Sequence, residues 1–299
     1  MLKFVKMQKI FKIGDVSVGG QPGELPTVLI GSLFHVGHKI VEDRISGIFD
    51  RRRAEHLINV QTEMSEKTGV PCMLDVVAEN PKALTRYIDF VSEVTNVPFL
   101  INGPNKSIRI AAAKYAVEAG LEKRVVYNSI NYTLVGEEIE AIGEIGLKAA
   151  VVQAFNPKKP WPEGMISMLK DLLEGAYKAG IEKPLGFMPV LDVPSIGLGA
   201  QGIRLAKEEF GIPTGTAPVG VVGLWSKVDE LGRFAKRLCR VGASTLAQAM
   251  GADFIIYGSV AKARDIFPVC AMVDAIIAYN SRNFGIRPLT KNHPLYKIF

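Results

Sequence analysis

Short apolar segments alternate along the chain with longer segments in which apolar residues recur every three or four positions. Short runs of Val, Ile, Leu and Phe are typical of parallel strands covered on both faces, and the longer period indicates amphipathic helices. The pattern predicts strands at residues 27–34, 72–78, 98–101, 124–128, 149–155, 185–191, 213–219 and 253–257. It predicts helices at residues 52–67, 81–95, 106–119, 136–144, 163–179, 199–210, 225–250 with a break near Gly242, and 261–283.

This alternation of strands and helices predicts an α/β fold. An open, doubly wound sheet is one arrangement of such units, but eight units favour closure into a TIM (β/α)8 barrel, which takes about 250 residues. The chain has 299 residues, enough for one barrel and short additions at both ends. We therefore expect a single domain over residues 1–299, with a hairpin or lid at residues 1–26 and a C-terminal arm at residues 287–299.

The composition narrows the class of protein. A hydrophobic content of 48% and a charged content of 22% indicate a globular protein with a large core. No apolar run reaches about 18 residues and the N-terminus has no signal-peptide core, so we expect no membrane span and a cytoplasmic location. The cysteines Cys72, Cys239 and Cys270 lie far apart, which predicts neither a disulfide framework nor a zinc site.

The net charge of +6 favours an acidic partner or an anionic ligand. The densest basic cluster, Arg51 to Arg53, opens a predicted helix and is interpreted as a solvated helix face. Nucleic-acid binding would require basic residues interleaved with aromatic residues on one face. The sequence shows no such stripe, so we expect no nucleic-acid partner.

Polar side chains follow the predicted strands at or just after their carboxyl ends. They are Asp75, Asn102, Asn128, Asn131, Asn156 and Asp192. In a barrel of parallel strands these ends meet at one mouth, where active sites are built. Amides and carboxylates supply donors and acceptors that suit the edge of an amide-like heterocycle. Asparagine also favours turns, but its repetition at successive strand ends favours a ligand site.

Three other patterns are weaker. The motif from Gly197 to Gly202 matches GxGxxG, but it lies in the sixth unit without the expected acidic partner, which favours a glycine-rich helix start over a dinucleotide site. His35 and His38 lack a third ligand, so they predict loop hydrogen bonds and no metal site. Asp75 and Glu79 could act as an acid/base pair or cap the next helix, and the sequence leaves both open.

Several collinear motifs carry a family resemblance. They are VGGQPGELPTVLIGSLF, GHKIVED with GIFD, LDVV, YNSIN, AFNP and YGSVAKARDIFPVCAMVD. Through them the chain resembles the H-type subunit of tetrahydromethanopterin S-methyltransferase over about residues 10–285. That family is similar to the methyltetrahydrofolate:corrinoid methyltransferases and to dihydropteroate synthase, which are pterin-binding TIM barrels.

The resemblance implies a methyltransferase. In the branch that the chain most resembles, which serves demethylation of compounds such as glycine betaine, a methyl group moves from a corrinoid to N5 of tetrahydrofolate. This implies tetrahydrofolate as acceptor, cobalamin or another corrinoid carried by a partner protein, and a homodimer formed through late helices such as residues 267–278. Because the corrinoid carries the difficult chemistry, no protein nucleophile or metal ligand is required, and the catalytic residues stay unassigned. The alternatives are tetrahydromethanopterin as the pterin, the reverse direction, or a non-catalytic subunit that docks a corrinoid protein.

The resemblance also assigns residues. Asn128 matches an asparagine that binds the pterin ring, and Asp192, in LDVPSIG, matches an aspartate that holds the amino and N–H groups of the pterin. Asn102 lies in LINGP where relatives more usually have an aspartate, so it can bond the ring without supplying charge.

One departure bears on the direction of transfer. Relatives of the methyltetrahydrofolate type place an asparagine that contacts N5 after the seventh strand, whereas residues 216–220, TAPVG, offer no amide side chain. That contact would help to protonate methylated N5. Its absence therefore favours methylation of tetrahydrofolate by the corrinoid over the reverse reaction.

Overall fold

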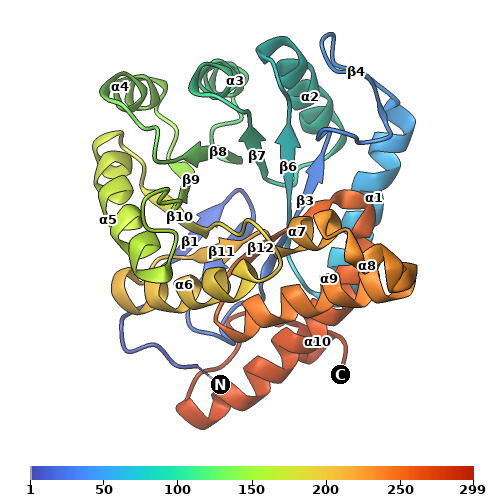
Figure 1. Ribbon diagram of the computed structural model, residues 1–299, viewed down its shortest axis with the longest axis vertical. Coiled ribbons are helices and arrows are strands. Elements are labelled where there is room, and N and C mark those ends of the chain that lie inside the picture. Colours follow the sequence, from blue (N-terminus) through green and yellow to red (C-terminus); the bar gives the residue numbers. More distant parts are fainter. Residues whose placement is uncertain (1) are drawn as a thin grey trace.

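In the computed structural model, which describes residues 2–299, eight parallel strands close into a barrel with helices around its outside (Figure 1). The strands follow one another around the barrel in chain order, and the last one pairs with the first. They are β3 (Val28–Leu33), β6 (Cys72–Val77), β7 (Phe99–Asn102), β8 (Val125–Ile130), β9 (Ala149–Gln153), β10 (Lys183–Met188), β11 (Thr214–Thr216) and β12 (Phe254–Ser259). The predicted TIM barrel is confirmed.

Helices connect the strands and cover their outer faces. The main ones are α1 (Arg51–Thr68), α2 (Pro81–Val94), α3 (Lys106–Glu118), α4 (Gly136–Ile145), α5 (Pro162–Lys178), α6 (Ser195–Phe210), α7 (Pro218–Leu224), α8 (Lys227–Glu230), α9 (Gly232–Ala249) and α10 (Ala263–Ser281). Three of them begin at side chains that accept from the backbone N–H three residues later, namely Asp50, Asn80 and Asn105. Such N-caps satisfy donors that the first helical turn leaves unpaired. No helix within residues 2–299 combines the length and apolar character needed to cross a bilayer.

The predicted boundaries are wrong around β11. The strand ends at Thr216, and Pro218 starts α7, a position that suits proline because the first helical N–H has no partner. The long helix expected after Trp225 breaks at Gly232 instead of Gly242. Gly232 adopts a positive φ of 89°, which only glycine tolerates without strain, whereas Gly242 lies inside α9.

The GxGxxG motif lies inside α6, so its glycines do not form a ligand-binding loop. A Cβ at Gly199 would lie 2.7 Å from Cγ1 of Val190, and a Cβ at Gly202 would lie 3.0 Å from Sδ of Met188. These glycines therefore allow α6 to pack closely on the segment around β10.

Side chains alternate between two apolar layers, as the period of a strand requires. In β3, Val28 and Ile30 face the inside of the barrel, while Leu29 and Leu33 join the layer between strands and helices. The inner layer also contains Ile13 and Val18, which come from a hairpin formed by β1 (Ile10–Ile13) and β2 (Val16–Gly19).

The hairpin closes the amino-terminal end of the barrel. The Gly14 N–H donates to the carbonyl of Lys123, just before β8, over 2.8 Å. The C-terminal arm reaches the same end, where the Leu289 N–H donates to the Glu24 carbonyl, and it ends in the short helix α11 (Pro294–Lys297). The predicted hairpin is present, but it is a plug opposite the strands' carboxyl ends and not a lid over them. A second antiparallel pair, β4 (Val41–Asp43) and β5 (Ile48–Phe49), lies between β3 and α1.

Asp274 of α10 is a buried carboxyl near the amino end of β3. It accepts from the Thr27 N–H at 2.9 Å, the Thr27 hydroxyl at 2.8 Å and the Gln248 amide at 3.0 Å. Burial raises the pKa of Asp274 to about 7 despite these donors. The folded protein therefore retains a proton here that the unfolded chain releases above its ordinary pKa of 3.8. The contribution of this group to stability falls as the pH rises from about 4 to 7 and is lowest above that window.

We expect Asp274→Asn to remove the part of the pH dependence of stability that the Asp274 carboxyl causes. The variant should gain stability over the wild type as the pH rises, by at most roughly 1.4 kcal/mol per pH unit across the window. Urea unfolding of both proteins at pH 5 and pH 8 measures the difference, with Asp171→Asn on the exposed face of α5 as control. A stability difference between Asp274→Asn and wild type that is the same at both pH values would contradict the assignment.

Candidate functional site

The inward-facing positions nearest the carboxyl ends of several strands are polar. Ser32, Asp75, Asn102, Asn128 and Gln153 each lie two residues after an apolar side chain of the inner layer, namely Ile30, Met73, Leu100, Val126 and Val151. Because side chains alternate along a strand, the polar side chains form the next layer of the barrel interior. The barrel interior is therefore lined by apolar side chains in its middle and by polar side chains at the mouth.

A cavity of about 360 Å³ opens above this layer. Its lining comprises Asp75, Asn102, Gly103, Pro104, Arg109, Asn128, Ser129, Asn131, Gln153, Phe187, Ala217 and Ile256. Polar side chains come mainly from β6 to β9, whereas Phe187, Ala217 and Ile256 form an apolar side. A cavity with one polar and one apolar side suits a flat heterocycle with a hydrogen-bonding edge.

Asp75 is the centre of the polar side. Its Oδ1 accepts from the amide nitrogens of Asn102 at 3.0 Å and Asn128 at 3.1 Å, and its Oδ2 accepts from the Ser32 hydroxyl at 2.9 Å. The residue is only 3% exposed. Burial raises the pKa of Asp75, and the three donors offset part of that rise.

The Asp75 carboxylate fixes the orientation of the side-chain amides of Asn102 and Asn128. An ionised carboxylate only accepts hydrogen bonds, so Asn102 and Asn128 must direct their NH2 groups at it. Their carbonyl oxygens are then available as acceptors for a ligand. The cluster thus offers two fixed acceptors for N–H groups of a ligand.

A buried ion pair supports the rim of this cavity. Arg109 donates from Nη2 to Glu138 at 3.1 Å and from Nη1 to the carbonyl of Gly103 at 3.0 Å. The Tyr127 hydroxyl donates to the same Glu138 oxygen at 2.6 Å. Both charges are buried, with side chains 4% and 1% exposed. They hold the loop after β7, on which Gly103 lies.

Asn131 lines the cavity but is partly engaged in its own turn. Its Oδ1 accepts from the backbone N–H of Thr133 at 3.0 Å and from the Thr133 hydroxyl at 2.8 Å. The structure therefore brings together Asp75, Asn102, Asn128 and Asn131 of the predicted site residues.

Asn156 and Asp192 lie beyond the same strand ends but do not line this cavity. Asn156 accepts from the N–H groups of Lys158 and Lys159, both at 3.1 Å, which fixes the turn before α5. Asp192 is exposed and accepts from the Ser195 N–H at 2.8 Å, a bond that lowers the Asp192 pKa and orders the start of α6. The structure does not bring either residue into this cavity, and local backbone donors hold both side chains.

The two carboxylates Asp75 and Glu79 do not form an acid/base pair. Glu79 is an exposed partner of Arg44 at 3.2 Å, and Asn80 caps α2 instead. His38 has the expected loop role, since its Nδ1 accepts from the Phe34 N–H at 3.1 Å. Within residues 2–299 no group of three or more His, Cys, Asp or Glu side chains is arranged to hold a metal ion.

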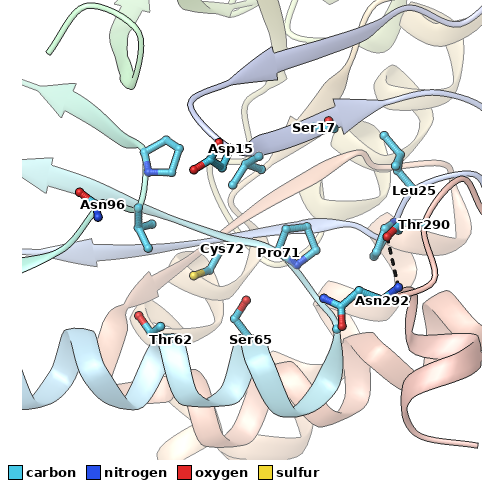
Figure 2. A pocket seen from close by; sticks show the side chains of 15 residues that line it. Asp15, Ser17, Leu25, Thr62, Ser65, Pro71, Cys72, Asn96, Thr290 and Asn292 are labelled. Atoms are coloured by element: carbon cyan, nitrogen blue, oxygen red, sulfur yellow. Dashed lines mark hydrogen bonds between the residues drawn. The ribbon is translucent and has the colours of Figure 1, made fainter.

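A second hollow of about 430 Å³ lies at the amino-terminal end (Figure 2). Thr62 and Ser65 face it from α1, Asp15 and Ser17 from the hairpin, and Cys72 from the start of β6. Ser65 and Thr62 donate to nearby backbone carbonyls, and burial raises the pKa of the Cys72 thiol to about 11. A thiol held in its neutral form is a poor nucleophile, so the mouth cavity is the better candidate site.

Three residues of the mouth were missed by the sequence analysis. Ser32 and Gln153 occupy inward positions at strand ends, and counting by two from the preceding inner residues would have found them. Arg109 comes from the first turn of α3, and its sequence neighbours give no signal of burial beside a strand end.

We expect Asp75→Asn to stabilise the protein at neutral pH. The isosteric amide removes a buried charge, its oxygen still accepts from Asn102 and Asn128, and its NH2 group can donate to Ser32. The gain should be of the order of 1 kcal/mol in the free energy of unfolding.

Asp75→Ala is the matched control, because it leaves the two amide NH2 groups without their acceptor. It should cost about 1–3 kcal/mol in the free energy of unfolding. Chemical denaturation of the three proteins measures both changes. A loss of stability in Asp75→Asn as large as that in Asp75→Ala would show that the charge itself holds the cluster together.

Comparisons with known proteins give consistent matches. Residues 6–289 match the family described as tetrahydromethanopterin S-methyltransferase MtrH subunit. The chain is 38% identical over 316 residues to the H-type subunit of tetrahydromethanopterin S-methyltransferase from Methanothermobacter thermautotrophicus, covering 100% of both chains. It is 40% identical over 309 residues to the H-type subunit of the putative methyltransferase mtx from Methanosarcina barkeri, covering 99% of both.

Solved structures share the fold. Dihydropteroate synthase of Xanthomonas albilineans with 4-aminobenzoic acid superposes with a TM-score of 0.60 at 17% identity, over 93% of this chain and 99% of that one. Dihydropteroate synthase of Thermus thermophilus gives a TM-score of 0.55 at 14% identity, over 88% and 98%. At these identities the likeness concerns the barrel architecture alone.

Proposed function

The chain belongs to the MtrH family of tetrahydromethanopterin S-methyltransferase and is a methyltransferase, and from this premise we propose that it moves a methyl group between N5 of a tetrahydropterin and the cobalt of a corrinoid carried by a partner protein. The observation that carries the proposal is the cluster of Asp75, Asn102 and Asn128 at the bottom of the mouth cavity.

The cluster suits the pyrimidine edge of a pterin. That edge presents a ring N–H and an amino group, and the carbonyls of Asn102 and Asn128 are turned to accept from such donors. Gln153 offers a further amide beside them. The apolar side of the cavity, with Phe187, lies against the ring, so polar and apolar contacts together set its orientation.

The proposed tetrahydropterin is tetrahydromethanopterin rather than tetrahydrofolate. Relatives that match the full chain at 38% identity carry tetrahydromethanopterin in their names, which reverses the order of preference that the sequence analysis gave. Both pterins share the ring edge that the cluster would bind, so the choice does not alter the roles of Asp75, Asn102 and Asn128.

The protein's part in the reaction is to bind and orient. The corrinoid supplies the cobalt that gives or takes the methyl group. Asp75 holds the two asparagines, the asparagines hold the ring edge, and the open mouth leaves the opposite side of the ring accessible to the partner. A methyl transfer of this kind requires no protein nucleophile.

We expect Asn128→Ala to weaken binding of tetrahydromethanopterin by about 1–3 kcal/mol, or roughly 5- to 150-fold in the dissociation constant, because one acceptor for the ring is lost. Titration calorimetry under anaerobic conditions measures it. A parallel titration with tetrahydrofolate tests the choice of pterin.

Asp192→Ala is the matched control, because Asp192 follows β10 and lies outside the cavity lining. It should leave the dissociation constant unchanged and lower stability only slightly, because it removes the side chain that orders the start of α6. Weaker binding in Asp192→Ala together with normal binding in Asn128→Ala would move the site away from the cluster.

The structure bears on the proposed direction through Ala217. Ala217 lines the cavity after β11, whereas Val219 is buried in α7. No amide side chain therefore enters the cavity from residues 216–220. Transfer to the pterin uses the neutral N5, whereas the reverse transfer requires a proton on methylated N5 so that this nitrogen can leave. Without an amide to stabilise that proton, we propose transfer from the corrinoid to the pterin.

We expect transfer from methylcobalamin to the tetrahydropterin to be nearly independent of pH around neutrality. The reverse reaction, from the methylated pterin to cob(I)alamin, should be slow and should fall as the pH rises, since less N5 is protonated. Ala217→Asn should speed the reverse reaction, with about 10²–10⁴-fold as the upper range for a positioned acid/base contact. Single-turnover absorbance measurements from pH 6 to pH 8 record both rates. A reverse rate that does not change with pH or with Ala217→Asn would overturn this account.

A homodimer remains a prediction. Most apolar residues of α10, such as Phe267 and Ala271, face the barrel of their own chain. Met272, Ile276 and Tyr279 are exposed at 44%, 49% and 66% with helical spacing, and they are the part of α10 that is free to form a symmetric contact.

A further inference from the structure

A basic pocket lies beside the mouth cavity, at the carboxyl ends of β3 and β12. It has a volume of about 470 Å³. Its polar lining comes from the loop after β3, which supplies His35, His38 and Lys39, and from the start of α1, which supplies Arg53 and His56. None of the residues that line it is acidic.

The charges around this pocket are poorly neutralised. The nearest carboxylate partner of Arg53 is Asp50 at 4.0 Å, and Asp50 already accepts from the Arg53 backbone N–H as the cap of α1. Lys262, which follows β12, is partly buried, and burial together with Arg240 lowers its pKa to about 8. Burial lowers the pKa of His38 to about 4, helped by His35, Arg53 and Lys262. Basic side chains from the loop after β3 and from the start of α1 thus line one hollow, and Lys262 is close enough to affect His38.

The histidines have unused hydrogen-bonding capacity here. Nδ1 of His35 donates to the Val36 carbonyl at 2.9 Å, while its Nε2 is buried and has no partner. Nδ1 of His38 accepts from the Phe34 N–H, so the proton of the neutral ring lies on Nε2. The two rings stack at 4.7 Å. An anion would accept from the Nε2–H of His38 and pair with the side chains of Lys39 and Arg53.

We propose that this basic pocket binds an oxyanion, phosphate or carboxylate, carried on the side chain of the tetrahydropterin whose ring occupies the mouth cavity. The identification of the carrier rests on the proposed function. It is supported by position, since Ser32 of β3 bonds Asp75 in the mouth cavity and His35 lies three residues further along the same chain segment. Acidic side chains are common to tetrahydropterin cofactors, so the two subsites would divide one ligand into ring and tail.

The first test probes the pocket without any pterin. The chain has four histidines, of which His35, His38 and His56 line the pocket, while His293 is fully buried at the amino-terminal end. Proton NMR of the histidine C2–H signals should show saturable shifts for the pocket histidines on addition of sodium phosphate or sulfate. The His293 signal should not move, and sodium chloride at equal ionic strength should have no such effect. Absence of saturable shifts would overturn the anion site.

The second test identifies the carrier with two pterins, tetrahydrofolate, which ends in carboxylates, and 6-methyltetrahydropterin, which has no acidic tail. Arg53→Gln should weaken tetrahydrofolate about tenfold, because it removes one charged contact, and should leave 6-methyltetrahydropterin unchanged. Arg52→Gln is the matched control, since Arg52 is the exposed neighbour outside the pocket.

The outcomes separate this inference from the proposed function. Binding of 6-methyltetrahydropterin depends on the mouth cavity alone, so its failure would count against the pterin function. Equal affinity of Arg53→Gln and wild type for tetrahydrofolate would overturn the assignment of the pocket to the pterin tail, even with the phosphate shifts present.

Discussion

The buried carboxylate of Asp75 is the constraint on which the organisation of the mouth depends. Four neighbouring strands meet at it, because Ser32 of β3, Asn102 of β7 and Asn128 of β8 all donate to Asp75 of β6. Taking an ionised carboxylate out of water is costly, and three hydrogen bonds recover only part of that cost. The raised pKa of Asp75 reflects this imbalance. The buried charge is unfavourable for stability, but it holds the amides of Asn102 and Asn128 in one orientation before a ligand binds.

The two ends of the barrel differ in role: the amino-terminal end contains contacts that hold the fold together, and the opposite end contains the candidate ligand site. At the amino-terminal end, Lys207 forms a buried ion pair with Asp253 at 2.6 Å and also donates to the Gly20 carbonyl, which ties α6 and β12 to the hairpin. The Lys207 ammonium group thereby has acceptors from two other parts of the fold. At the mouth, the amide nitrogens of Asn102 and Asn128 donate to Asp75, so their carbonyl oxygens are turned away from it. Acceptors held in this way are consistent with a ligand site at the carboxyl ends of the strands.

The fold could be predicted from the sequence because most strands are short, largely apolar runs covered on both faces. The same feature limited the prediction of the site. In such a run the inward and outward positions are both apolar, so the alternation that distinguishes them is hidden. Asp75 and Asn128 stand out as polar residues inside a strand, and both line the cavity. Asn156 and Asp192 come after their strands have ended, where backbone donors of the next turn compete for the side chain. The resemblance to pterin-binding barrels assigned Asp192 to the pterin ring. In the structure β10 ends at Met188, four residues before Asp192, and its last inward-facing side chain is the apolar Phe187.

The apolar side of the cavity explains how binding alone can serve methyl transfer. The side chains of Phe187, Ala217 and Ile256 provide no donor or acceptor, so only the ring edge that faces β6 to β9 would be held by side-chain hydrogen bonds. A ring gripped at one edge and flanked by apolar surface has one favourable orientation, in which the other edge faces the mouth. The reacting nitrogen of a tetrahydropterin lies in the second ring, away from the pyrimidine edge. The asymmetry of the lining, more than any single reactive side chain, would therefore present that nitrogen to a cobalt centre brought by another protein.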